Sequence, residues 1–193
     1  MNMASASLHK AVALPLAPTT RTTVPESMQP VLASIAQSLG FVPNLFATFA
    51  HSPTLFSGCL AADGAWTKGT LTAVERELVL LTASVTNDCT YCSAAPSLIL
   101  KAMLKADPAI VAAMRTGQPL ADARQDALVR LVREVVAERG HATPATVQNF
   151  LAAGWRANQV LEVLLGIAMK TISYYAHHLT QVPVEAPFQS EVR

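Results

Sequence analysis

Signals that start and stop helices follow one another along this chain, and they leave little room for β-strands. A capping side chain followed by proline, which suits the first turn of a helix, occurs three times, at Ser52–Pro53, Asp107–Pro108 and Thr143–Pro144. Between these starts, apolar residues recur at helical spacing, and glycines follow where the spacing ends. The sequence therefore predicts an all-α fold with short connections.

The expected helices cover most of the chain. Thr72 and Glu75 form a capping box ahead of the segment ERELVLLTASVTN, and Asp122 caps the amphipathic segment ALVRLVREVVAER. The most apolar helix, QVLEVLLGIAMKTISYYAHHL, comes last. The predicted helices span residues 28–39, 43–50, 52–68, 72–87, 92–105, 107–116, 122–139, 143–153 and 158–179.

The length of 193 residues suits one domain with an added arm. Residues 1–24 lack a helical period and are rich in Thr, Ala and Pro, so we expect an extended N-terminal arm. Residues 25–193 are expected to form a single helical domain. Residues 71–92 and 156–177 share an apolar pattern, which indicates either an internal helical duplication or a chance likeness between two apolar helices.

Composition narrows the classes of partner. Hydrophobic residues make up 51% of the chain and charged residues 14%, so apolar helix faces are expected to pack between copies in a homo-oligomer. The net charge of +1, with Lys and Arg scattered, gives no nucleic-acid footprint. No apolar run approaches the roughly 20 residues of a membrane span. Because three cysteines do not form a secreted disulfide framework, we expect a cytoplasmic protein.

Cys89 and Cys92 form a C-x-x-C pair at a predicted helix start. Two thiols at this spacing can close a disulfide, share a metal ion or act as a redox couple, and they can also be small buried apolar side chains. A helix N-terminus favours a thiolate, which suits a redox role for Cys92. A zinc site needs two further ligands, and no second C-x-x-C or H-x-x-x-H occurs, so we expect no metal.

Two further groups could move protons near the dithiol. Glu77 lies on the preceding helix beside apolar residues, where a carboxylate is costly unless it is paired or used. It is either a proton acceptor for a thiol or the partner of Arg76. His177 and His178 end the last helix, where one of them could reach the dithiol or both could stabilise the helix C-terminus.

These residues together resemble the alkylhydroperoxidase D-like proteins of the carboxymuconolactone decarboxylase superfamily. The family motif is Glu, eleven residues, C-x-x-C, three residues and His, and Glu77, Cys89 and Cys92 fit it. A looser likeness to the peroxidase-related branch extends over roughly residues 25–190 and places His178 at that branch's histidine. The resemblance implies an all-helical homo-oligomer without an organic cofactor.

The resemblance also implies roles. Cys92 would attack a peroxide, Cys89 would resolve it as a disulfide, and Glu77 would act as general base, with His178 as a further proton carrier. The motif histidine is replaced by Pro96, which can neither accept nor donate a proton. A proline is tolerated in the first turn of a helix, and we expect Pro96 to lie there. Loss of a positioned acid–base group is worth about 10²–10⁴ in rate.

The expected function is a thiol-dependent peroxidase that reduces a small hydroperoxide, forms a disulfide and is restored by a partner thiol or dithiol. The replacement at Pro96 leaves other functions open. They are disulfide exchange, a catalytically weak oligomeric binding protein and, less favoured because it does not need a C-x-x-C, lactone decarboxylation.

Overall fold

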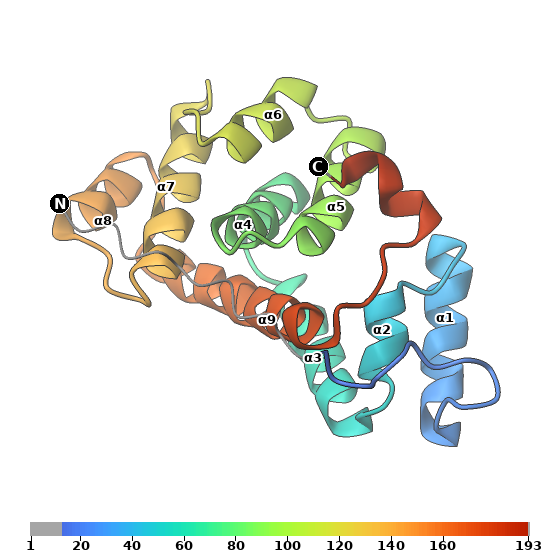
Figure 1. Cartoon of the computed structure of the whole chain (residues 1–193). Coiled ribbons are helices and arrows are strands. Elements are labelled where there is room, and N and C mark those ends of the chain that lie inside the picture. Colours follow the sequence, from blue (N-terminus) through green and yellow to red (C-terminus); the bar gives the residue numbers. More distant parts are fainter. Residues whose placement is uncertain (1–12, 193) are drawn as a thin grey trace, which may run out of the picture.

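The computed structural model describes residues 13–192, and every regular element within them is helical. A 3₁₀ turn at Glu26–Met28 leads into nine α-helices, which Figure 1 shows in chain order. They are α1 Gln29–Leu39, α2 Asn44–Phe49, α3 Pro53–Trp66, α4 Ala73–Thr86, α5 Thr90–Leu98, α6 Pro108–Thr116, α7 Ala123–Ala137, α8 Pro144–Ala152 and α9 Gln159–Thr180. A π-helix at Ile99–Met103 extends α5, and a 3₁₀ helix at Ala186–Glu191 ends the described chain. The all-α prediction is confirmed.

The capping side chains act as the sequence predicts. Ser52, Asp107, Asp122 and Thr143 each accept a hydrogen bond from a backbone N–H in the first turn of their helix. Thr72 and Glu75 form both hydrogen bonds of the capping box at the start of α4. One start was placed wrongly. α5 begins at Thr90, two residues before the predicted start at Cys92, and its N-cap is Cys89.

Helix α4 lies at the centre of the fold and packs against α5, α7 and α9 (Figure 1). One apolar core gathers around α4 and α7 and includes Leu78, Leu128 and Phe150. A second core lies around α2, α3 and the start of α5, and both Cys89 and Cys92 belong to it. The dithiol is therefore held in a packed apolar region at the junction of α4, α5 and α9.

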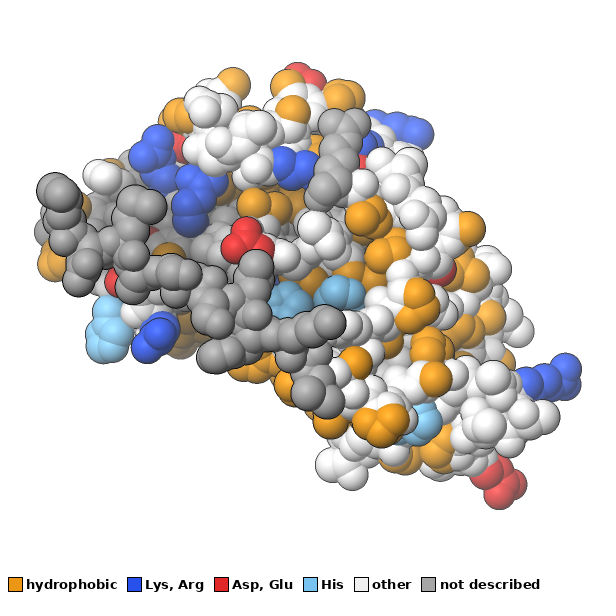
Figure 2. Space-filling model, viewed as in Figure 1, with side chains coloured by type: hydrophobic (Ala, Val, Ile, Leu, Met, Phe, Trp, Pro, Cys, Tyr) orange, Lys and Arg blue, Asp and Glu red, His pale blue; other side chains and the backbone are white. Residues whose placement is uncertain are grey.

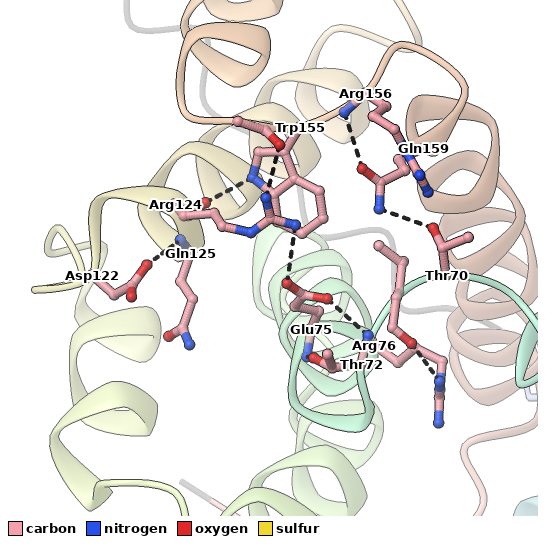
Figure 3. A network of polar contacts seen from close by, with 12 residues as sticks. Thr70, Thr72, Glu75, Arg76, Asp122, Arg124, Gln125, Trp155, Arg156 and Gln159 are labelled. Carbon is pink, nitrogen blue, oxygen red and sulfur yellow. Dashed lines mark hydrogen bonds and ion pairs between the residues drawn. The ribbon is translucent and has the colours of Figure 1, made fainter.

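A polar network fixes the N-terminal end of α4, the helix that carries Glu77 (Figure 3). Arg124 lies with its guanidinium 3.7 Å from the centre of the Trp155 ring and donates to Glu75 at 3.4 Å. Trp155 in turn donates its indole N–H to the Arg124 carbonyl at 3.0 Å. Gln159, at the start of α9, donates to the Thr70 hydroxyl at 2.9 Å. The network ties the starts of α4, α7 and α9 together.

Close packing positions α9 against α3. The indole N–H of Trp66 donates to the Glu162 carbonyl at 2.7 Å, and the Trp66 ring lies over Gly166. Any side chain at Gly166 would collide with this ring and with Val79 of α4. The glycine thus allows α9 to approach α3 and α4 closely, which brings the C-terminal end of α9 to the dithiol.

The predicted arm falls partly outside the described residues, because its first twelve residues are not among them. Leu14 donates its N–H to Leu179 at 2.7 Å, and Thr19 donates to Ala47, so the described part lies against α9 and α2. Division of the chain at residue 24 stays a prediction. The helices of the two possibly duplicated segments differ in length. α4 ends at Thr86, while α9 continues past the corresponding position to Thr180. No helix in residues 13–192 is long and apolar enough to cross a membrane.

Candidate functional site

A tight turn between α4 and α5 presents the first cysteine. Asp88 adopts a left-handed backbone (φ 51°), and the Cys89 N–H donates to the Ser84 carbonyl at 3.0 Å. Cys89 then caps α5, and its Sγ accepts the N–H of Cys92 at 3.3 Å. Cys89 and Cys92 are only 2% and 3% exposed. The pair is a reduced, buried dithiol whose first sulfur faces the free N–H groups of a helix start.

The two thiols differ sharply in acidity. The hydrogen bond from the Cys92 thiol, together with those from His177 and the Cys92 N–H, outweighs burial and lowers the pKa of Cys89 to about 4. Because Cys92 donates this hydrogen bond, the bond raises the pKa of Cys92, and burial raises it further. The prediction that Cys92 lies closer to the helix N–H groups and has the lower pKa is wrong. A helix N-cap side chain receives the N–H groups, and the cap is Cys89.

His177 is the histidine in contact with the dithiol. Its Nδ1 lies 3.6 Å from Cys89 Sγ, across 88 positions of sequence. Its ring stacks on Tyr91, with ring centres 4.8 Å apart and an angle of 19°. The Tyr91 hydroxyl donates to Glu185 Oε1 at 3.0 Å and accepts the Leu45 N–H at 3.1 Å. The C-terminal segment and α2 thus hold the ring that orients His177.

His178, the histidine chosen from the family likeness, lies next to this contact and is exposed. One of its ring nitrogens, the Cys89 sulfur and a His177 nitrogen all lie within 4.8 Å of one another. The structure therefore brings both histidines to Cys89 but places His177 nearer. A role for His178 in proton transfer stays a prediction.

Glu77 projects from α4 in a largely apolar setting. Burial raises the pKa of Glu77 to about 7, although the positive charges of Lys170 and Arg76 draw it down. Its Oε2 is buried without a hydrogen-bond partner. Lys170, on α9, also acts on Cys92, where its charge lowers the pKa. Glu77 is thus a carboxyl that titrates near neutral pH. The positive charge of Lys170 acts on both Glu77 and Cys92.

Pro96 lies inside α5 and not in its first turn, because the helix already begins at Thr90. The predicted position was therefore wrong. A proline at this point removes the N–H that would pair with the Cys92 carbonyl one turn earlier. The hydroxyl of Ser84, from α4, lies 3.1 Å from that carbonyl and 2.7 Å from the Leu80 carbonyl, so its single proton is shared between the two acceptors. Ser84 thereby partly replaces the donor that Pro96 removes beside the dithiol.

Sequence reasoning did not single out Tyr91, Lys170 or Ser84. Tyr91 stands within the C-x-x-C, where its ring had no distinguishing pattern, and Ser84 and Lys170 lie on helices with no motif around them. Their places depend on how α9 crosses α4 and α5, which a single sequence does not fix. Taken together, the site offers a stabilised thiolate, a second protonated thiol, an imidazole at the thiolate and a carboxyl that titrates near pH 7.

Residues 53–134 match the model of the carboxymuconolactone decarboxylase family. Among curated proteins, no sequence matches the chain significantly. The fold is similar to that of two uncharacterized peroxidase-related proteins. One, from Silicibacter sp. TM1040, has TM-score 0.79 and 19% identity, covering 95% of this chain and 97% of that chain. The other, from Ralstonia eutropha JMP134 and described as an alkylhydroperoxidase AhpD core, has TM-score 0.78 and 22% identity, covering 91% and 96%.

A third similar structure is a cysteine-to-alanine variant of the debrominase Bmp8 in complex with 2,3,4-tribromopyrrole. It has TM-score 0.79 and 16% identity, covering 94% of this chain and 97% of that chain. The shared fold extends well beyond the segment that the family model matches. The match of residues 53–134 to the carboxymuconolactone decarboxylase family model and the likeness of the whole fold to the alkylhydroperoxidase AhpD core both support the superfamily predicted from the sequence.

Proposed function

We propose that this chain is a thiol-dependent oxidoreductase that reduces a small hydroperoxide with the Cys89–Cys92 dithiol. The observation that carries the proposal is Cys89 at the N-cap of α5, where the Cys92 N–H and His177 stabilise its thiolate. The thiolate is the reactive form of cysteine toward peroxides. A thiolate already formed below neutral pH needs no base to generate it.

The reaction balances with the residues present. Cys89 attacks the distal peroxide oxygen, the O–O bond breaks, and Cys89 becomes a sulfenic acid while an alkoxide leaves with the electron pair. His177, within reach of Cys89, supplies the proton to the alkoxide. Cys92 then gives its proton to Glu77 and attacks the Cys89 sulfur, a disulfide forms, and the hydroxide that is displaced takes the proton back from Glu77 and leaves as water. An external thiol or dithiol restores the pair.

This assignment exchanges the roles that the family likeness implied, since Cys89 attacks and Cys92 resolves. Burial supports a small oxidant over a protein disulfide. Cys89 is 2% exposed, so it cannot meet the disulfide of a folded partner without a rearrangement, whereas a small hydroperoxide or a small thiol can diffuse to it. Because the fold is shared with a debrominase, 2,3,4-tribromopyrrole is the second substrate to assay.

The test is a thiol titration of the reduced protein before and after one equivalent of hydroperoxide. The native chain and the Cys59→Ser control should each lose two thiols. Cys92→Ser should accumulate a sulfenic acid on Cys89, and Cys89→Ser should react slowly. If Cys89→Ser instead forms a sulfenic acid on Cys92, the order of attack reverts to the one implied by the family. If neither variant changes the reaction, the redox proposal fails and a binding role is favoured.

A further inference from the structure

The cluster formed by Cys89, His177 and His178 is unusual because it joins three metal-binding side chains at one end of α9. Their ligand atoms lie within 4.8 Å of one another. Cys89 is buried, His177 is half-buried and His178 is exposed, so the cluster opens to solvent on the His178 side. Figure 2 shows histidine side chains at the surface above this end of α9. The proposed reaction with peroxide draws its proton from His177 and does not use His178.

The measured separation agrees with zinc coordination. Zinc binds sulfur at about 2.3 Å and imidazole nitrogen at about 2.0–2.1 Å, and at a tetrahedral angle these bonds place the two ligand atoms about 3.6 Å apart. Cys89 Sγ and His177 Nδ1 are 3.6 Å apart. The His178 ring, on an exposed side chain, reaches the third corner by rotation of its side-chain torsions. One corner stays open for water.

The surroundings also suit a ligated sulfur and an oriented imidazole. The Cys92 N–H already donates to Cys89 Sγ, a bond that remains available when the sulfur holds a metal. Stacking on Tyr91 fixes the plane of the His177 ring, and the Tyr91 hydroxyl is itself held by Glu185. Outer contacts of this kind orient metal ligands and raise affinity.

We propose that Cys89, His177 and His178 form a Zn²⁺ site of the reduced protein. One thiolate and two imidazoles match the preference of this borderline ion. Zn²⁺ binds the sulfur of Cys89 as a thiolate, without electron transfer. The ion and the disulfide exclude each other, because an oxidised Cys89 has no thiolate to offer, so Zn²⁺ would withhold Cys89 from peroxide. The site itself does not rest on the proposed peroxidase reaction.

The experiment is a titration of the reduced, metal-free protein with Zn²⁺ in competition with a chromophoric chelator, repeated with Co²⁺ as a spectroscopic probe. We expect one ion per chain and a thiolate-to-cobalt charge-transfer band. Cys89→Ser and His178→Ala should each weaken Zn²⁺ binding by at least about 100-fold, since even outer-shell partners are worth 10–100-fold. His178→Ala changes an exposed side chain and should fold normally. His141→Ala, at an exposed histidine outside the cluster, and Cys59→Ser are the matched controls.

Cys92→Ser separates this proposal from the proposed function. That variant should keep the Zn²⁺ site, with less than a few-fold loss of affinity, although it cannot form the disulfide. Two outcomes overturn the metal site. One is the absence of stoichiometric binding, and the other is binding that needs Cys89 and Cys92 but is unchanged in His178→Ala. The loss of two thiols on peroxide treatment would stand in either case, and a failed peroxide reaction would leave the Zn²⁺ result unaffected.

Discussion

The substitution Glu77→Gln should remove a pH dependence of stability that the site imposes on the native chain. Glu77 is half-buried, its Oε2 is buried and unpaired, and its pKa is raised from 4.5 to about 7 in the folded chain. A group that binds its proton more tightly when folded destabilises the folded state once it must ionise. Glutamine keeps the shape of the neutral carboxyl and never carries the charge.

The sign and size follow from the two pKa values. Below about pH 4.5 the carboxyl is protonated in both states, so the native chain and the variant should have similar free energies of unfolding. Between about pH 4.5 and 7 the unfolded chain releases the proton first, and the stability of the native chain falls. Above pH 7 the difference levels off at roughly 3 kcal/mol in favour of Glu77→Gln, at 1.4 kcal/mol per tenfold.

Urea unfolding at pH 5 and pH 8.5 measures this difference. Glu134→Gln is the contrasting control, because hydrogen bonds from Thr146 and Thr143 lower the pKa of that exposed carboxyl and give the opposite sign. Equal stabilities of the native chain and Glu77→Gln at pH 8.5, with Glu134→Gln behaving as expected, would refute a buried, neutral Glu77. The carboxyl would then be an ordinary ion pair with Arg76 or Lys170, and it could not serve as a proton acceptor near pH 7.

Three further predictions concern the dithiol, its helix and the assembly. In the Cys59→Ser variant, the rate of Cys89 alkylation should be independent of pH from pH 6 to 8, because the pKa of Cys89 is lowered to about 4. The substitution His177→Ala should move the inflection of this rate to higher pH, and an inflection near pH 8.5 with His177 intact would contradict the thiolate. Ser84→Ala should destabilise the chain by about 1–3 kcal/mol in denaturant unfolding, since it removes the hydroxyl proton that the Leu80 and Cys92 carbonyls share. The loss should be smaller in the Pro96→Ala background, where a backbone N–H is restored, and equal losses in both backgrounds would show that the hydroxyl does not replace the missing donor. Light scattering should show a homo-oligomer, because Leu161, Leu164, Tyr175 and Leu179 are exposed along α9, and a monomer at micromolar concentration would contradict it.

Local signals predicted the helices well because caps and glycines act on neighbouring residues. The starts at Ser52, Thr72 and Asp122 lie where their side chains can accept a backbone N–H, and the structure shows those bonds. The start of α5 was missed for the same reason. Its cap is Cys89, a sulfur side chain outside the usual set of capping residues, so the polar residues before it gave no cue to the correct position.

Contacts across the chain were much harder to anticipate. The sequence placed Cys89, Cys92 and Glu77 together through one motif, but His177 reaches Cys89 only because Gly166 lets α9 pass close to α3 and α4. Adjacent histidines on a helix differ by about 100° in direction, so the choice between His177 and His178 depends on the rotation of α9 about its axis. That rotation is set by packing against Trp66 and Tyr91, and no local pattern encodes it.

The replacement of the motif histidine has a consistent physical explanation in these contacts. A histidine at position 96 would stand on α5, whereas His177 approaches Cys89 from α9, so an imidazole is present at the dithiol without the motif position. The Ser84 hydroxyl, 3.1 Å from the Cys92 carbonyl, partly replaces the backbone donor that proline at that position removes. The hydrogen bond from the Cys92 thiol and the contact with His177 both favour a thiolate on Cys89. These donors are the reason that the proposed reaction begins at the first cysteine and not at the second.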